Sequence, residues 1–121
     1  MILDHHQFAH RLFYFILHDG DIYDIKILLL KSSRININLN YLEYNGQSLV
    51  HLCCLYNRLD LLKIFVNLGH CDILMMNRDG WLPLHIAVYL GYMDISYAFI
   101  FLLIIKKTFS PVSIPKRKCE Q

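Results

Sequence analysis

The chain repeats a pattern of residues at an interval of 34 positions along its 121 residues. When residues 45–65 are laid over residues 79–99, a glycine falls in a turn, a histidine early in a first helix and an acid at the start of a second helix. Self-similarity at such a period is typical of a repeat architecture, in which each unit buries its apolar face against the next. The identical pairs are Gly46 and Gly80, His51 and His85, Asp60 and Asp94, and Phe65 and Phe99.

The third unit, residues 79–105, shows the pattern most clearly. Its stretch Leu82-Pro83-Leu84-His85 resembles the Thr-Pro-Leu-His signature of ankyrin repeats, with leucine in place of threonine. The second unit, residues 45–78, keeps a hydroxyl at the corresponding position, Ser48. Each ankyrin unit is a turn followed by two antiparallel helices. We therefore predict an all-α fold, an ankyrin-repeat solenoid of about three helix-turn-helix repeats.

A first unit precedes these two. We expect its inner helix over residues 11–18, its outer helix over residues 24–29 and a small insertion in the loop 37–44. Three histidines near the N-terminus, His5, His6 and His10, are expected to form a frayed polar end. The predicted organisation is an N-terminal extension (1–7), an ankyrin repeat domain (8–105, with repeats 8–44, 45–78 and 79–105) and a basic C-terminal tail (106–121).

Short-range signals mark the turns and helix ends. Asn45-Gly46 and Asp79-Gly80 favour tight turns with positive φ, and Gly69 is expected to cap the helix that begins at Asp60. Three acidic residues stand where the first outer helix begins, and carboxylates there stabilise a helix N-terminus through its dipole. They are Asp19, Asp21 and Asp24.

Composition excludes several classes of protein. Hydrophobic residues make up 55 % of the chain, which is incompatible with an intrinsically disordered chain. The longest apolar run, residues 97–105, is far shorter than the roughly 20 residues of a transmembrane helix. Residues 1–105 carry a net charge of −2 and residues 106–121 a net charge of +4, so we do not expect the repeats to bind nucleic acid directly.

The cysteines and the N-terminus indicate the compartment. The four cysteines do not have the spacing of a disulfide framework, so we expect free thiols in a reducing environment. No secretory signal peptide is evident, and we expect the protein in the nucleus, the cytoplasm or both. The run Lys116-Arg117-Lys118 is either a nuclear localisation signal or a solvated tail.

No constellation of residues predicts catalysis. His51, Cys53 and Cys54 resemble metal ligands, but a second pair at suitable spacing is missing, so no metal site is expected. The shared repeat position of His51 and His85 predicts instead that both imidazoles hydrogen-bond backbone near the turn. The glycines are scattered and form no phosphate-binding loop. We expect no enzyme, no cofactor and no small-molecule substrate.

The turns and inner helices of a repeat stack form a surface suited to a protein partner. The turn residues Arg78, Asp79 and Trp81 are candidates, as are Tyr56 and Tyr89 on the inner helices. Trp81, the only tryptophan, has two interpretations, a core residue or a binding anchor, because aromatic side chains dominate both settings.

From Arg11 to Ile95 the chain resembles the Notch-regulated ankyrin repeat proteins. The resemblance rests on Arg11-Leu12-Phe13, on the long first-repeat connection and on Asn77-Arg78-Asp79-Gly80-Trp81. It implies a non-catalytic protein that binds the Notch intracellular domain with its DNA-binding transcription factor, extends the ankyrin stack of Notch and lowers Notch-dependent transcription. It also implies that Trp81 is an interface residue and that Val88, where the family has alanine, lies beside it.

Other functions stay open from the residues. One alternative is a generic small ankyrin adaptor or an enzyme inhibitor with an unrelated partner, and another is a membrane-associated scaffold that uses residues 99–105. The apolar stretch 97–105 is interpreted as a docking surface, a membrane contact or an atypical end. Because the stretch has no polar face, unlike an interfacial helix, we favour a protein contact or an atypical end over a membrane.

Overall fold

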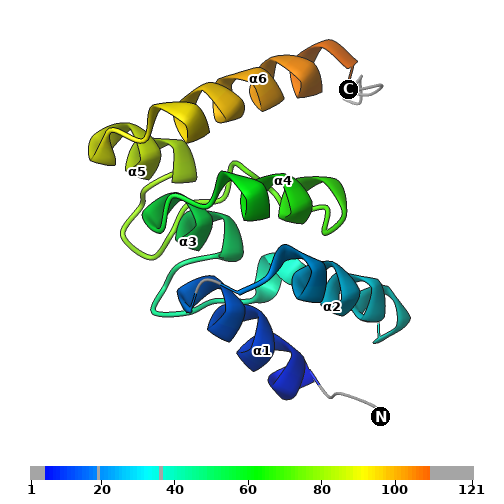
Figure 1. Cartoon of the computed structure of the whole chain (residues 1–121). Coiled ribbons are helices and arrows are strands. Elements are labelled where there is room, and N and C mark those ends of the chain that lie inside the picture. The colour runs from blue at the N-terminus through cyan, green and yellow to red at the C-terminus, as the bar shows by residue number, and fades with distance from the viewer. Residues whose placement is uncertain (1–4, 19, 36, 110–121) are drawn as a thin grey trace, which may run out of the picture.

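The computed structural model, which describes residues 5–18, 20–35 and 37–109, places three helix pairs one above another (Figure 1). Helices α1, α3 and α5 contact one another along one layer, and α2, α4 and α6 along a second. In the described residues the regular elements are helices, which confirms the predicted all-α stack. The pairs are α1 (His5–Leu17) with α2 (Ile22–Ile35), α3 (Leu49–Leu55) with α4 (Leu59–Asn67), and α5 (Pro83–Leu90) with α6 (Met93–Phe109).

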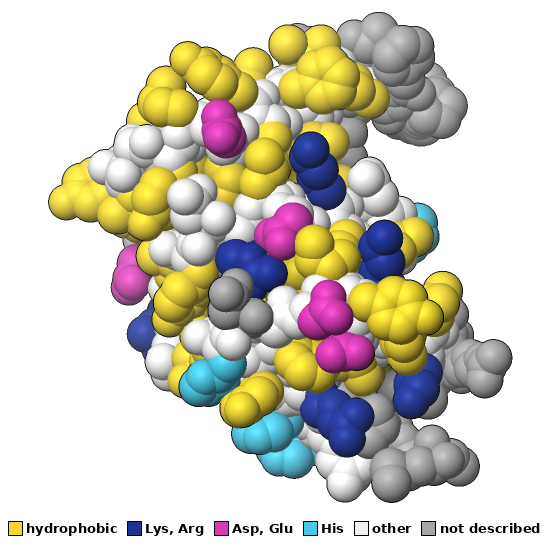
Figure 2. All heavy atoms as spheres, in the orientation of Figure 1, with side chains coloured by type: hydrophobic (Ala, Val, Ile, Leu, Met, Phe, Trp, Pro, Cys, Tyr) yellow, Lys and Arg dark blue, Asp and Glu magenta, His cyan; other side chains and the backbone are white. Residues whose placement is uncertain are grey.

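The surface changes character along the stack. Lysine, arginine and acidic side chains mix across the middle of the view in Figure 2, as expected for a solvated surface. Hydrophobic side chains gather along its upper edge, where Figure 1 places α6. The last repeat is therefore the most apolar part of this face.

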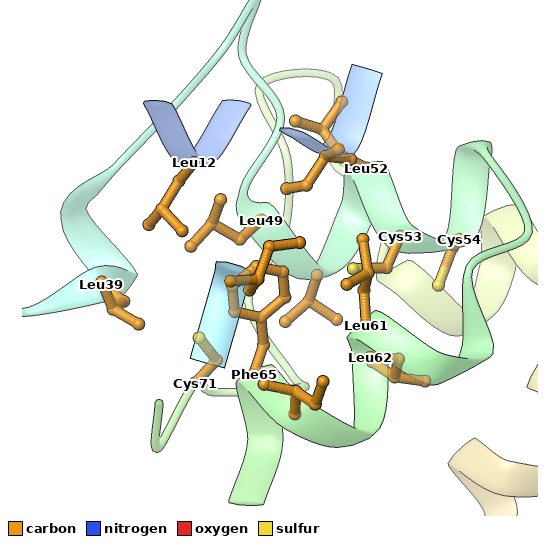
Figure 3. Close-up of a cluster of buried hydrophobic side chains, with 14 of the residues drawn as sticks. Leu12, Leu39, Leu49, Leu52, Cys53, Cys54, Leu61, Leu62, Phe65 and Cys71 are labelled. Carbon is orange, nitrogen blue, oxygen red and sulfur yellow. The ribbon is translucent and has the colours of Figure 1, made fainter. Parts of the chain in front are cut away.

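The core runs without interruption between the two layers. Figure 3 shows Leu12 of α1, Leu49 of α3 and Phe65 of α4 pointing toward one another. Phe8, Phe65 and Phe99 are almost fully buried, so each repeat supplies at least one large ring to this core. Burial across the boundaries between repeats is what lets such short helix pairs fold together.

The first helix begins earlier than predicted. It starts at His5 rather than Arg11, so the expectation that His5, His6 and His10 form a frayed end was wrong. Phe8 and Leu12, one helical turn apart, are both fully buried, and their packing stabilises the additional turns.

The outer helix α2 is also longer than predicted, since it spans Ile22–Ile35 rather than residues 24–29. The side chain of Asp21 accepts a hydrogen bond from the backbone N–H of Tyr23 at 3.1 Å, which supports the predicted role of an acid at this helix N-terminus.

The predicted turns of the second and third repeats are confirmed. Asn45 (φ 53°) and Gly46 (φ 78°) form a two-residue turn closed by an antiparallel bridge between Tyr44 and Gln47. In the turn that opens the third repeat Gly80 has a positive φ, of 86°, and Asp79 does not. Both glycines occupy the left-handed region that side chains with a Cβ atom avoid.

The prediction that Gly69 caps α4 was wrong. The helix ends at Asn67 with Leu68 as its C-cap, and the left-handed residue is His70, with φ 55°. Gly69 serves close approach instead, because a Cβ atom there would stand 2.7 Å from Leu39 Cδ1 and 2.7 Å from the Phe65 carbonyl oxygen. Leu39 belongs to a 3₁₀ helix, η1 (Leu39–Tyr41), inside the predicted insertion.

Candidate protein-interaction surface

One buried imidazole joins the second repeat to the third. His51, on α3, is fully buried. Its Nδ1 lies 2.7 Å from Ser48 Oγ and its Nε2 lies 2.8 Å from the backbone carbonyl oxygen of Trp81. A carbonyl only accepts, so the neutral ring must carry its proton on Nε2 and accept at Nδ1 from the Ser48 hydroxyl.

Burial disfavours the protonated form of this imidazole. Desolvation lowers the pKa of His51 below its ordinary value, although its hydrogen bond to the Trp81 carbonyl acts in the opposite sense. The predicted backbone hydrogen bond is present, and its partner is in the next repeat rather than in the turn of its own repeat. His51 therefore ties two repeats together.

Two further hydrogen bonds complete the junction. The backbone N–H of Arg78 donates to the carbonyl oxygen of Gly46 at 3.0 Å, and Asn77 Nδ2 donates to Gln47 Oε1 at 2.9 Å. Asn77 also shapes its own turn, because its Oδ1 accepts from the N–H groups of Asp79 at 3.0 Å and Trp81 at 2.8 Å. It holds Trp81 and Asp79 in place.

The second repeat contacts the third through one face of α3, and the third repeat exposes the equivalent face of α5. In α3 the side chains of Val50, His51 and Cys54 are buried, whereas their counterparts 34 residues later are partly or fully exposed, Val88 by 59 %. We call this surface the stack-end face. It comprises Trp81, Leu84, His85, Val88 and Tyr89.

Trp81 is neither a core residue nor a freely exposed one. Its side chain is 40 % exposed, and its ring meets those of Tyr89 and His85 edge to face, with centroids 5.6 Å and 6.4 Å away. These contacts leave one side of the indole open to a hollow of about 610 Å³, lined by the stack-end face with Asp79 and Gly80. A half-buried, pre-positioned tryptophan is a typical anchor for a protein partner.

His85 repeats only half of the role of His51. Its Nδ1 accepts a hydrogen bond from the backbone N–H of Leu82 at 3.1 Å, as His51 bonds to Ser48 in the preceding repeat. The neutral ring therefore carries its proton on Nε2. His85 is exposed, and the described residues offer its Nε2 no counterpart of the Trp81 carbonyl.

Four of the six predicted site residues, Asp79, Trp81, Val88 and Tyr89, line this one hollow. Arg78 is exposed on the same turn. Tyr56, which is 50 % exposed, follows α3 and lies outside the stack-end face.

Sequence reasoning missed Leu84 and His85 as surface residues. The 34-residue register pairs them with Val50 and His51, and in the described part of the chain no further repeat covers them.

The inner helices offer a second, smaller depression. A hollow of about 230 Å³ lies between the second and third repeats and is lined by Leu55, Asn77, Ile86 and Leu90, among others. It shares Trp81 and Tyr89 with the larger hollow. The turn tryptophan therefore separates two apolar depressions.

The thiols are buried within the described chain. Cys53, Cys54 and Cys71 are free and buried. Burial raises the pKa of Cys54 and of Cys71 to about 12, and it raises the pKa of Cys53 as well. Thiols of this kind are poor nucleophiles. Cys119 and the run Lys116-Arg117-Lys118 lie outside the described residues.

Within residues 5–18, 20–35 and 37–109 no group of three or more His, Cys, Asp or Glu side chains is arranged to hold a metal ion. In the same ranges no helix is both long and apolar enough to cross a membrane.

Known proteins match most of the chain. Residues 12–108 match the family model described as ankyrin repeats in three copies. The chain is 35 % identical over 85 residues to the Notch-regulated ankyrin repeat-containing protein of Xenopus tropicalis. The match covers 70 % of this chain and 74 % of the relative. The Homo sapiens protein of the same name is 34 % identical with the same coverage, and protein B of Danio rerio is 34 % identical with 70 % and 76 % covered. No solved structure matches the chain.

Proposed function

The chain belongs to the ankyrin-repeat family and, within it, to the Notch-regulated ankyrin repeat-containing proteins, and from this premise we propose that it is a non-catalytic regulator. It binds the Notch intracellular domain together with that protein's DNA-binding transcription factor and attenuates Notch signalling. The stack-end face is the surface that carries this binding.

The observation that supports the proposal is the contrast between two equivalent junctions. Val50, His51 and Cys54 are each at most 1 % exposed under the third repeat. Of their counterparts at the end of the stack, Leu84 is half-buried, His85 is exposed and Val88 is 59 % exposed. Apolar surface left open on this scale marks a binding site. A partner that presents another repeat would bury it in the way the third repeat buries the second.

The polar groups of the face specify what such a partner must offer. In the internal junction a backbone carbonyl accepts from His51 and a backbone N–H donates to Gly46. The corresponding groups at the end are the Nε2–H of His85 and the carbonyl of Gly80. A turn of a partner repeat supplies both complements, so the face fits the end of another ankyrin stack.

The test is gel filtration of the full chain with purified Notch intracellular domain, the transcription factor and cognate DNA. We expect co-elution that requires all the components. Trp81→Ala should weaken binding by about 2 kcal/mol, or about 30-fold in Kd, because the substitution removes a pre-positioned anchor. Circular dichroism should show unchanged helical content, since the indole is 40 % exposed.

Tyr41→Ala is the matched control. Tyr41 is also an exposed aromatic side chain, 82 % accessible, but it lies in η1 of the first repeat. Its removal should leave the affinity unchanged. Equal losses for both variants, or unfolding of Trp81→Ala, would exclude the stack-end face as the binding site.

If a soluble, helical chain does not co-elute, the alternative is a generic ankyrin adaptor or enzyme inhibitor with an unrelated partner. The smaller hollow favours that function, because Leu55, Tyr89 and Leu90 line it on the inner-helix surface where stacked repeats commonly bind.

A further inference from the structure

Helix α6 carries a second apolar surface, which is separate from the stack-end face. Its side toward the core is closed, since Ile95, Ser96 and Phe99 are buried. Its opposite side exposes five large apolar side chains by 46–62 % each, and Figure 2 shows hydrophobic side chains along this edge of the molecule. We call this surface the α6 stripe; it comprises Met93, Tyr97, Ile100, Phe101 and Ile104.

A partner on the stack-end face would not cover the centre of this stripe. In the 34-residue register Tyr97 corresponds to Lys63 and Phe101 to Asn67. Lys63 and Asn67 are exposed although the second repeat is stacked on both sides. Tyr97 and Phe101 therefore face solvent at positions that stacking leaves open, and another kind of contact must account for them.

The spacing of the stripe matches pairing with a single helix. Met93, Tyr97, Ile100 and Ile104 follow one another at intervals of four, three and four residues. This is the spacing of the apolar seam in a two-helix coiled coil. Phe101 lies beside the seam.

The dipole of α6 favours a second copy in antiparallel orientation, because each helix then sets its positive end beside the negative end of its partner. A two-fold axis then brings Tyr97 of one copy against Ile100 of the other, and Met93 against Ile104.

The size of the stripe sets the strength of this pairing. Five half-exposed side chains of this type supply on the order of 500 Å² on each copy, so that a pair buries about 1,000 Å², near the lower limit of specific interfaces. We propose that the chain forms a weak, reversible antiparallel homodimer through the α6 stripe, which leaves the stack-end face free.

Sedimentation equilibrium of the full chain tests the proposal from about 1 µM to about 200 µM, the range in which a weak pair dissociates. The weight-average mass should rise from 14.4 kDa toward twice that value. Tyr97→Lys with Phe101→Asn should stay monomeric and folded throughout, because these substitutions install the side chains that α4 carries at the same positions. Val88→Gln, on the stack-end face, should dimerise like the wild type.

A charge pair tests the antiparallel register. Tyr97→Lys alone and Ile100→Glu alone should each be monomeric, while an equimolar mixture of the two should form a heterodimer, because residue 97 of one copy lies against residue 100 of the other. A parallel pair aligns each residue with its own counterpart, so mixing would set no lysine against a glutamate. It would only relieve the like-charge repulsion of each variant, which high salt would also relieve in each variant alone.

Three results would overturn the proposal. The first is a wild-type chain that is monomeric over the whole range. The second is a dimer abolished by Val88→Gln but not by the substitutions in the stripe. The third is a monomer that floats with phosphatidylserine vesicles through Tyr97 and Phe101, which would make the stripe a membrane contact. Because none of these measurements involves Notch components, they are independent of the proposed function.

Discussion

Replacing His51 by alanine tests whether one imidazole holds the second and third repeats together. The substitution removes the hydrogen bonds of Nε2 to the Trp81 carbonyl at 2.8 Å and of Nδ1 to Ser48 Oγ at 2.7 Å. It leaves the Ser48 hydroxyl without its acceptor and removes one of the two donors to the Trp81 carbonyl, which still accepts from the Asn77 backbone N–H at 2.9 Å. Each lost hydrogen bond costs about 1 kcal/mol. The fully buried ring also leaves a cavity, which adds about 1 kcal/mol. We therefore expect the free energy of unfolding to fall by about 3 kcal/mol.

Urea denaturation followed by circular dichroism measures this loss, with both midpoint and slope recorded. His85→Ala is the internal control, because it removes the same side chain at the equivalent position of an exposed end. The hydrogen bond from the Leu82 N–H and the edge contact with the Trp81 ring are lost there, both at an exposed side chain, so we expect about 0.5 kcal/mol. A loss below about 1 kcal/mol for His51→Ala, or equal losses for the two variants, would refute the assignment of the junction to His51.

The remaining predictions concern pH, turn geometry and thiol reactivity. Burial lowers the pKa of His51, so as the pH falls the unfolded chain takes up a proton near pH 6.5, before the native chain does. The free energy of unfolding should therefore be full above that pH and fall below it by up to about 1.4 kcal/mol per pH unit. Urea midpoints of His51→Ala should lack this fall at low pH. Gly46→Ala should destabilise the protein more than Gly80→Ala. Both positions have positive φ, which costs about 1 kcal/mol, but only at Gly46 would the new Cβ stand 2.7 Å from Arg78 Cβ; equal urea midpoints would contradict this. Alkylation by iodoacetamide at pH 8, mapped by peptide, should be slow at Cys54 and Cys71 in the native chain, because burial raises each pKa to about 12, and rapid in urea; fast native labelling would show that these thiols are accessible.

The fold was largely predictable because the repeat signals are local. The glycine turn and the histidine near the start of the inner helix recur 34 residues apart in the second and third repeats, and each signal acts within a few residues. The misassigned elements depend on contacts between segments distant in sequence. Phe8 extends α1 because it packs into the core, and Gly69 is required because Leu39, thirty residues earlier, packs against it.

Those residues of the candidate site that a local signal marks were predicted, and those whose exposure depends on a neighbouring repeat were not. A turn position identifies Trp81, Asp79 and Arg78 as surface residues without a structure. Whether His85 is buried like His51 depends on whether a further repeat follows, which the motif itself does not encode. The structure answers this question, because His51 is fully buried under the third repeat whereas His85 is exposed.

The last repeat combines two apolar surfaces that have different causes. Terminal repeats of a stack normally carry polar outer faces for solubility, and here neither exposed side of the third repeat follows that rule. The stack-end face is apolar at positions that are buried in an internal repeat, so another repeat can satisfy it. The α6 stripe is apolar at Tyr97 and Phe101, where the internal repeat is polar and exposed, so no added repeat would bury these side chains. One end of this small protein is therefore suited to two partners at once, one extending the stack and one lying along its outer helix.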